Sequence, residues 1–285
     1  HIYGFKLWKG PNTLKIDDVI IHGISPTKSL YNLNGKRKPF DQFKVTSRLF
    51  FELYNERFDI IDNASFVFLN CYMLKFLSLF KKTKIVFTWH QYFGEYLIGF
   101  MGKLMGTLSL ILERLSVNLT KNNIAVSNFV RKELLKRNVP EENIKVIYNG
   151  ADIKSANAIK IKKKHYDLIF VGRLAYQKNL KLLIESIEIV KKEFPNIKIA
   201  LVGDGEEKLA LKLLISKLDL KDNFVFLGKI NDKNKIFRLL KYSKIFVLPS
   251  LLEGFPLTVI EANASGLPVI TTKTKRNNVS EYIIN

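Results

Sequence analysis

The chain contains one cysteine, Cys71, among its 285 residues. An internal disulfide is therefore excluded, and a single thiol fits a reducing compartment. Long apolar runs are missing too, because Lys75 and Lys103 interrupt the longest ones before they reach the length that crosses a bilayer. We therefore expect no transmembrane helix. No predicted strand ends in an Asp-x-Asp cluster that could hold a metal ion, since the adjacent Asp17 and Asp18 lie in a predicted turn.

Acidic residues are scarce, with 26 Asp and Glu against 46 Lys and Arg, which gives a net charge of +20. The excess is even: residues 1–152 hold 22 basic and 13 acidic side chains, and the remainder hold 24 and 13. A basic tail for nucleic acid would be lopsided, so we expect no nucleic-acid partner. Two explanations stay open. The lysines are simply solvated, or they give affinity for an anionic membrane surface or a phosphorylated substrate.

The composition, 47% hydrophobic and 25% charged, is that of a globular protein long enough for two domains. In the N-terminal half the pattern predicts two short strands joined by a Gly-Pro-Asn turn within the first 25 residues. Further strands are expected at 58–69, 84–90 and 122–127, with helices at 40–57, 94–115 and 128–138, and residues 143–152 close this half. Ser127 is a predicted helix N-cap. The strand at 84–90 ends in polar residues, which favours a functional loop after it.

The C-terminal half is more regular, and strands alternate with helices along it. The strands are expected at 167–172, 197–203, 223–228, 244–250 and 268–271, with a helix in each interval between them. This alternation predicts a parallel sheet covered on both faces, with its ligand beyond the carboxyl ends of the strands. We expect an N-terminal domain at 1–152, a polar, lysine-rich linker at 153–165 and a C-terminal domain at 166–285.

Four of these strands end in a small residue: Gly172, Gly203, Gly228 and Ser250. A single glycine there is explained by a tight turn, whereas all of them together indicate a crest of loops that a ligand backbone can approach closely. The first loop also carries two cations, at positions 173 and 178. Next to a helix N-terminus they would suit a diphosphate, although two solvated surface cations fit the spacing equally well.

The stretch from Pro249 to Ile270 is almost entirely uncharged, yet it keeps Glu253 and Glu261. Glu253 lies in a predicted loop, and Glu261 lies one turn into a helix that begins near Leu257. The helix N-terminus offers unpaired N–H groups to a phosphate, while the two carboxylates could accept hydrogen bonds from sugar hydroxyls. The alternative is one acid at a helix start plus one structural carboxylate.

These motifs resemble a known enzyme family. Glu253 and Glu261 in the pattern E-x7-E, with VGRL…K and LVGDGEE, are similar to family 4 (group 1) glycosyltransferases, which have the GT-B fold. IYNGAD and AVSNFVRKEL fit the same family. TWHQYFGEY resembles one subgroup, with Gln91 in place of an acid and Phe93 in place of a second tryptophan. The resemblance covers essentially the whole chain and implies an α/β protein of two Rossmann-like domains.

The resemblance also implies roles for individual residues. Arg173 and Lys178 would neutralise the diphosphate of a nucleotide sugar, helped by the amides of residues 255–257. Glu253 would contact the transferred sugar, Glu261 the ribose, and His90 the reacting sugar and acceptor. The remaining donor-site positions would be Gly203, Gly228, Lys229, Gly254, Phe255, Pro256 and Leu257.

The family reaction retains the anomeric configuration and uses no metal or other cofactor. The resemblance therefore implies a transferase that moves a sugar to a lipid-linked or glycan acceptor. It also implies a cytoplasmic location, peripheral on the inner face of the membrane. A non-catalytic nucleotide-sugar-binding module and a nucleotide-sugar epimerase of the same fold are the alternatives.

Compared with the family pattern, two parts are missing from this sequence. The family opens with a strand and a glycine-rich loop, whereas this chain starts at what reads as the second strand. It stops 24 residues after Glu261, before the usual C-terminal helices. The comparison predicts a fragment of a longer reading frame, in which donor binding can survive without full activity.

Overall fold

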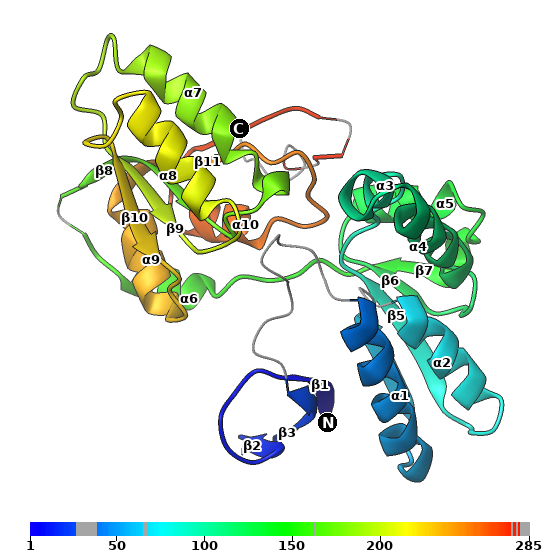
Figure 1. The fold of residues 1–285 in the computed structure, drawn as a ribbon. Coiled ribbons are helices and arrows are strands. Elements are labelled where there is room, and N and C mark those ends of the chain that lie inside the picture. The colour runs from blue at the N-terminus through cyan, green and yellow to red at the C-terminus, as the bar shows by residue number, and fades with distance from the viewer. Residues whose placement is uncertain (27–38, 65–67, 162, 275, 278, 280–285) are drawn as a thin grey trace. The chain divides into compact units, whose positions relative to one another are not determined.

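The computed structural model describes residues 1–26, 39–64, 68–161, 163–274, 276, 277 and 279 (Figure 1). They belong to two compact units, His1–Ile147 and Tyr148–Asn285. Both units are of the α/β class that the sequence predicts. No helix in the described part of the chain is long and apolar enough to span a membrane.

Unit 1 begins with a small sheet of strands in the order β1 (Ile2–Lys6), β3 (Val19–Pro26), β2 (Thr13–Ile16). The sequence predicted two strands here, and the third is a correction. Asp17 adopts a left-handed conformation with φ 52°, which short polar residues tolerate in tight turns. The chain therefore reverses at Asp17–Asp18, and β2 pairs antiparallel with β3.

The main sheet of unit 1 is wholly parallel. Its strands are, in spatial order, β4 (Ile60–Ala64), β5 (Lys84–Trp89), β6 (Asn123–Ala125) and β7 (Ile144–Val146). Its helices are α1 (Pro39–Asn55), α2 (Phe68–Ser78), α3 (Tyr96–Met101), α4 (Lys103–Ser116) and α5 (Asn128–Leu135). Ser127 caps α5 as predicted, because its side chain accepts a 3.0 Å hydrogen bond from the Val130 N–H.

Two predictions in unit 1 were wrong about where an element ends. The strand expected at 58–69 stops at Ala64, and Phe68 already belongs to α2, whose helical spacing buries Cys71, Leu74 and Leu77. The single helix expected at 94–115 is broken at Gly102, which has φ 85°. Helices α3 and α4 then fold against each other so tightly that a Cβ on Gly106 would lie 2.4 Å from the Ile98 Cα.

The cysteine is part of the core of unit 1. Cys71 is fully buried, and the Asn63 amide donates to its sulfur at 3.3 Å. Burial raises the pKa of the thiol to about 12. Since the thiolate is the reactive form, this thiol is chemically inert in the folded protein.

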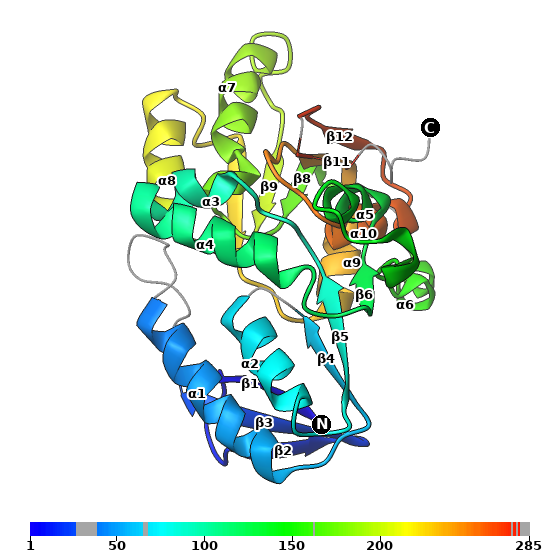
Figure 2. The same cartoon turned by 90° about the vertical axis from the view of Figure 1, so that its right-hand side faces the viewer.

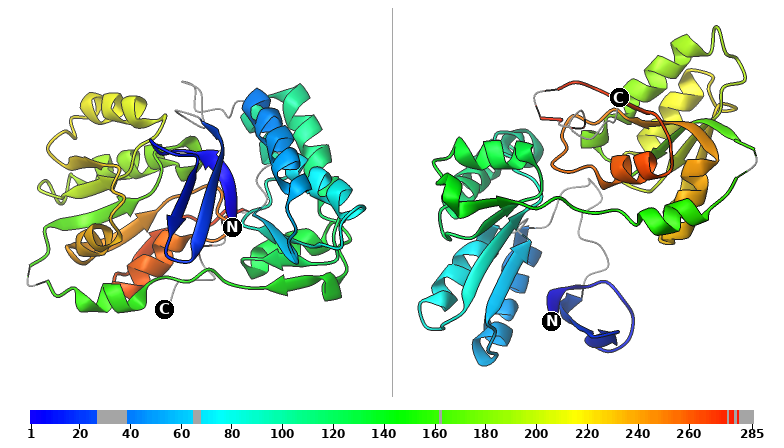
Figure 3. Two further views of the ribbon diagram at one scale, coloured as in Figure 1. Left: turned by 90° about the horizontal axis from the view of Figure 1, so that it is seen from below. Right: turned by 180° about the vertical axis from the view of Figure 1, so that it is seen from behind.

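Unit 2 contains a five-stranded parallel sheet with the order β10-β9-β8-β11-β12 (Figure 3). The chain runs through β8 (Tyr166–Val171), α7 (Leu180–Val190), β9 (Ile199–Val202), α8 (Lys208–Lys217), β10 (Phe224–Gly228), α9 (Lys233–Lys241), β11 (Ser243–Leu248), α10 (Leu257–Ala264) and β12 (Val269–Thr271). Every predicted strand is present. β8 and β9 are apolar because helices cover both faces: α7 packs with α8, and α10 packs with α9.

The segment expected as a linker is partly helical. Helix α6 (Ile153–Ala158) begins at Asp152, whose carboxylate accepts a 3.0 Å hydrogen bond from the Ser155 N–H. Ala156 is fully buried in the core of unit 2, where α6 packs against α9 and α10. The polar sequence hides this helix because only one of its residues is fully buried.

The glycine at the end of β9 is required by a close backbone approach. Gly203 has φ 138°, and a Cβ there would lie 1.8 Å from the Gly172 carbonyl oxygen. We expect Gly203→Ala to lower the stability of unit 2 by about 3–5 kcal/mol, from backbone strain plus overpacking. Calorimetric unfolding measures this loss.

Gly228→Ala is the matched control, because Gly228 also has positive φ, 71°, but a Cβ added there would meet nothing within 4 Å. This variant should lose only the stability that backbone strain costs, about 1–2 kcal/mol. Equal losses in the two variants would show that the approach to Gly172 is unimportant.

Candidate functional site

The strand order of unit 2 reverses between β8 and β11, which are neighbours in the sheet. The loops that follow them leave in opposite directions, and such a switch point is where parallel sheets bind ligands. The structure ties the two loops together. The Leu251 N–H donates to the Gln177 carbonyl at 2.8 Å, and Lys178 Nζ lies 2.6 Å from Glu253 Oε1.

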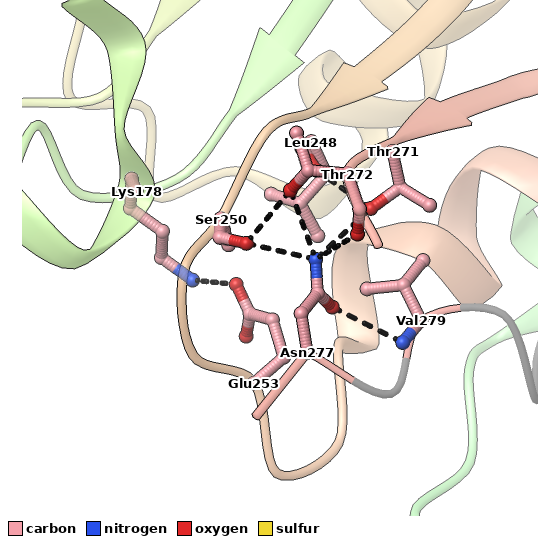
Figure 4. A network of polar contacts seen from close by, with 8 residues as sticks. All are labelled: Lys178, Leu248, Ser250, Glu253, Thr271, Thr272, Asn277 and Val279. Atoms are coloured by element: carbon pink, nitrogen blue, oxygen red, sulfur yellow. Dashed lines mark hydrogen bonds and ion pairs between the residues drawn. The ribbon is translucent and has the colours of Figure 1, made fainter. Parts of the chain in front are cut away.

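Lys178 and Glu253, predicted to contact different parts of one ligand, form an ion pair with each other (Figure 4). Their side chains are only 19% and 9% exposed, so the pair is poorly solvated. Lys178 ends a short 3-10 turn, Tyr176–Lys178, that brings its side chain toward the loop after β11. A partly buried pair of this kind holds both groups in defined positions and leaves the second oxygen of the carboxylate for another donor.

Arg173 is also paired with a carboxylate, at the neighbouring loop. Its Nη2 lies 2.8 Å from Glu206 Oε2, and Glu206 is mostly buried. Backbone hydrogen bonds from Leu174 N–H to the Asp204 carbonyl, and from Glu207 N–H to the Leu174 carbonyl, hold the two loops in register. Sequence reasoning assigned no role to Glu206. Its place after the strand adjacent to β8 is the signal that could have identified it.

The crest of glycines predicted from the sequence is continuous in the structure. The Gly172 N–H donates to the Val202 carbonyl at 2.9 Å, and the Gly203 N–H donates to the Gly228 carbonyl at 2.8 Å. The ends of β8, β9 and β10 therefore form one edge of half-buried backbone. Lys229, which follows this edge, is exposed to solvent.

The amides predicted to bind a diphosphate at residues 255–257 need a correction. Pro256, which precedes the first residue of α10, has no N–H, and the Leu257 N–H already donates to the Phe255 carbonyl at 3.1 Å. The neighbouring Thr258 N–H has no acceptor among the described residues. Gly254 is buried within the loop. In the first turn of α10 it is thus the Thr258 N–H, and not the Leu257 N–H, that can bind an anion.

Glu261 lies half-buried on α10, and no described residue donates a hydrogen bond to its carboxylate. Loss of solvent raises the pKa of Glu261, and Lys233 at the start of α9 opposes that shift. A desolvated carboxylate without donors is suited to accept hydrogen bonds from a ligand. The structure shows no contact between it and Glu253.

Asn277 supports the loop that carries Glu253. Its Nδ2 donates to the carbonyls of Ser250 at 2.8 Å and Thr272 at 2.9 Å, and its Oδ1 accepts from the Val279 N–H at 3.1 Å (Figure 4). The Glu253 N–H in turn donates to the Arg276 carbonyl at 3.0 Å. No sequence pattern identified Asn277, because most of its partners are backbone groups that only the fold brings together.

His90 lies in unit 1, directly after β5, and it is exposed. The loop after it is anchored by a buried carboxylate: Glu113 on α4 accepts hydrogen bonds from the Phe93 N–H at 2.8 Å and the Gly94 N–H at 2.7 Å. Sequence reasoning overlooked Glu113. Its signal was a lone acid in a helix whose other charged residues, Lys103 and Arg114, are basic. Among the described residues, no group of His, Cys, Asp or Glu side chains is arranged to hold a metal ion.

We predict that Glu113→Gln destabilises unit 1 by about 2–3 kcal/mol. The glutamine keeps one acceptor oxygen but turns an NH₂ toward a backbone N–H, so a charge-assisted hydrogen bond is replaced by two facing donors. Both tryptophans, Trp8 and Trp89, belong to unit 1, so the denaturant midpoint of tryptophan fluorescence measures this unit alone. Glu142→Gln, at an exposed position, is the control that should leave the midpoint unchanged.

Sequence relatives are glycosyltransferases. The chain is 35% identical over 161 residues to the capsular polysaccharide biosynthesis glycosyltransferase CapH of Staphylococcus aureus, covering 55% of this chain and 44% of that protein. It is 37% identical over 149 residues to the Escherichia coli UDP-Gal:alpha-D-GlcNAc-diphosphoundecaprenol alpha-1,3-galactosyltransferase, covering 47% of this chain and 38% of that enzyme. The matched segments thus span less than half of these relatives.

The fold is shared with solved structures of such enzymes. Anabaena HepE in complex with UDP matches with a TM-score of 0.69 at 18% identity, covering 93% of this chain and 70% of that one. This likeness confirms the expected GT-B fold. The family model of glycosyl transferases group 1 matches residues 139–285, and that of glycosyltransferase family 4 matches residues 11–155. Together with the crest of unit 2, these matches show that the chain belongs to the group 1 glycosyltransferases.

Proposed function

We propose that this chain is part of a retaining glycosyltransferase that moves a sugar from a nucleoside diphosphate to a lipid-linked or glycan acceptor. The observation that carries the proposal is the poorly solvated Lys178–Glu253 pair at the switch point of unit 2. It places a cation suited to a phosphate beside a carboxylate suited to sugar hydroxyls. Such a pair is what a nucleotide sugar, anionic at its centre and hydroxylated at its ends, requires.

The diphosphate would be held by side chains and backbone of unit 2. Lys178 and Arg173 supply positive charge, and the Thr258 N–H with the dipole of α10 supplies an uncharged donor. Each cation is shared with a carboxylate, Glu253 or Glu206, which fixes its position before the ligand arrives. These preorganised groups would stabilise the negative charge that grows on the leaving diphosphate, in a reaction that we propose runs without a metal ion or other cofactor.

The two glutamates would bind opposite ends of the donor. Lys178 holds one oxygen of Glu253, and no described residue donates to the other, which would accept from hydroxyls of the transferred sugar. Glu261 would accept from the ribose, and Gly203, Gly228 and Lys229 would border the base. In unit 1, His90 would act on the reacting sugar and acceptor, on a loop kept in place by Glu113.

The acceptor is proposed from the relatives. The Escherichia coli enzyme is named for an acceptor linked to diphosphoundecaprenol, and CapH for a capsular polysaccharide. We infer an acceptor of the same kind here, a sugar on a lipid carrier or a growing cell-envelope glycan. Such an acceptor would bring the enzyme to the cytoplasmic face of a membrane.

The first prediction concerns donor binding. The nucleotides to be tested are UDP, GDP, ADP and their sugar conjugates. UDP is the first candidate because the Escherichia coli galactosyltransferase is named for UDP-Gal. At about 100 times its dissociation constant, the nucleotide that binds should raise the free energy of unfolding by about 2.7 kcal/mol. This corresponds to a rise in Tm of about 5 °C or more. Glu261→Gln should abolish the rise, since it replaces the carboxylate that accepts from the ribose. Thermal unfolding measures both.

The stability of the same variant without nucleotide shows whether Glu261 is needed for folding. Because the pKa of Glu261 is raised in the folded protein, the folded state gains stability as the pH falls through that pKa. Without nucleotide, Glu261→Gln should therefore be at least as stable as the parent at neutral pH, and its advantage should shrink in acid. A loss of nucleotide response together with a loss of stability would instead mean that Glu261 is structural.

The second prediction concerns the reaction, tested in the full-length enzyme. The product should keep the anomeric configuration of the donor sugar by NMR, and EDTA should leave the rate unchanged. Lys178→Gln should lower kcat by about 100-fold or more, the usual effect of removing one stabilising group from a transition state. Lys181→Gln, at an exposed cation nearby, is the matched control.

An inverted product or a requirement for a divalent ion would contradict the proposed mechanism. Interconversion of the donor sugar without any acceptor would favour an epimerase. Donor binding with no turnover in the full-length protein would favour a binding module.

A further inference from the structure

His90 lies in a loop of residues 90–95, here called the His90 loop, which joins the end of β5 to α3 (Figure 2). His90 itself is exposed, but Tyr92, two residues later, is only 3% exposed. The side chain of Tyr92 thus ties the loop to the core of unit 1, while His90 remains open to a ligand.

Arg137, which follows α5, lies over the ring of Tyr92. Its guanidinium carbon is 3.7 Å from the ring centroid, which makes a close cation–π contact. The guanidinium is itself held in place, because its Nη1 donates to the Glu133 carbonyl at 2.6 Å and to Glu133 Oε2 at 2.9 Å. The Arg137 carbonyl accepts a hydrogen bond from Asn118 Nδ2 at 3.3 Å. Arg137 therefore offers the ring a fixed cation.

The hydroxyl of Tyr92 does not contribute to this anchoring. It is buried and has no hydrogen-bond partner among the described residues, and the same is true of Arg137 Nε. Buried polar atoms are nearly always paired, so two unpaired ones side by side are a cost that the fold accepts. The ring is held by its face, which lies on the guanidinium, and not by its polar end.

Backbone contacts hold the chain on both sides of His90 as well. Before the His90 loop, the Val126 N–H donates to the Trp89 carbonyl at 3.3 Å. Later in the loop, two backbone N–H groups donate to the buried carboxylate of Glu113. Together with the stacked ring, these contacts leave residues 90 and 91 between two fixed points, Trp89 and Tyr92.

We propose that Arg137 is a positioning residue for the transfer reaction, acting through Tyr92 to keep His90 in place. This role rests on the function proposed for His90, and it brings in a residue from a different segment of the chain. Catalytic groups have to be held within about 0.5 Å of the productive geometry, which is why a second anchor beside His90 matters. If the stack only stabilised unit 1, its loss would reduce folding without a specific loss of rate.

Turnover of the full-length enzyme tests this role. Arg137→Gln removes the cation and Tyr92→Leu removes the ring, and each should lower kcat about 10- to 100-fold. The KM for the nucleotide sugar should stay within about twofold of the parent value, because the groups proposed to bind it lie in unit 2. The double variant should lose no more than about twofold beyond either single variant, because both remove the same contact. Glu133 stays paired with Lys136 in Arg137→Gln, so no isolated carboxylate is left behind.

Two further variants serve as controls. Tyr92→Phe is the conservative variant, since it keeps the ring face and removes only the unpaired hydroxyl. It should recover the parent kcat and at least the parent Tm. Arg131→Gln removes an arginine of α5 whose ion-pair partner, Glu141, is 72% exposed. It should change neither kcat nor Tm, because exposed ion pairs contribute little.

Hydrogen exchange tests the same role without turnover. In the parent protein the His90 loop should exchange slowly where its N–H groups are bonded to Glu113. Arg137→Gln and Tyr92→Leu should speed exchange in residues 90–95 at least about tenfold, while strands β5, β6 and β7 keep the parent rate. Tryptophan fluorescence should confirm that both variants are folded at the assay temperature.

Faster exchange in the His90 loop with an unchanged kcat would overturn the proposal, and so would a loss of kcat that only follows the loss of folded protein. Equally faster exchange throughout unit 1 would show that the stack is purely structural. A failure of the proposed function is recognised separately. His90→Ala would then keep the parent kcat although the loop still exchanges faster without Arg137, and that result would overturn the roles of both residues.

Discussion

Two loops that leave a parallel sheet in opposite directions are held together by one backbone hydrogen bond and one ion pair. The hydrogen bond joins Leu251 to Gln177, and the ion pair joins Glu253 to Lys178. Everything proposed for donor binding depends on this connection. Without it, the carboxylate after β11 and the cation after β8 would move independently, and neither would be in place when a ligand arrives.

The connection is supported on both sides. On one side, Arg173 and Glu206 join the loop after β8 to the loop after β9, whose glycine lies against the Gly172 carbonyl. On the other side, Asn277 gathers the carbonyls of Ser250 and Thr272 beneath Glu253. Polar groups that are paired in this way make a rigid support, and rigidity is what a site for a charged ligand needs.

Whether a feature could be predicted from the sequence depended on how far apart in the chain its interacting residues lie. The strands of unit 2 were predictable because short apolar runs ending in glycine carry their own signal. The E-x7-E spacing likewise placed Glu253 and Glu261 on the loop and helix where they lie. The start of α2 and the break at Gly102 were missed, because an apolar run fits strand and helix alike and one glycine does not by itself end a helix. Glu206, Glu113 and Asn277 were missed because their partners come from other segments of the chain.

The buried thiol has a practical consequence. Because Cys71 is the sole cysteine and burial raises its pKa to about 12, the native protein offers thiol reagents no competing target. A cysteine introduced at any exposed position is then the one residue that takes up a fluorophore or spin label. Reporters can therefore be placed in either unit while the native cysteine stays in the core.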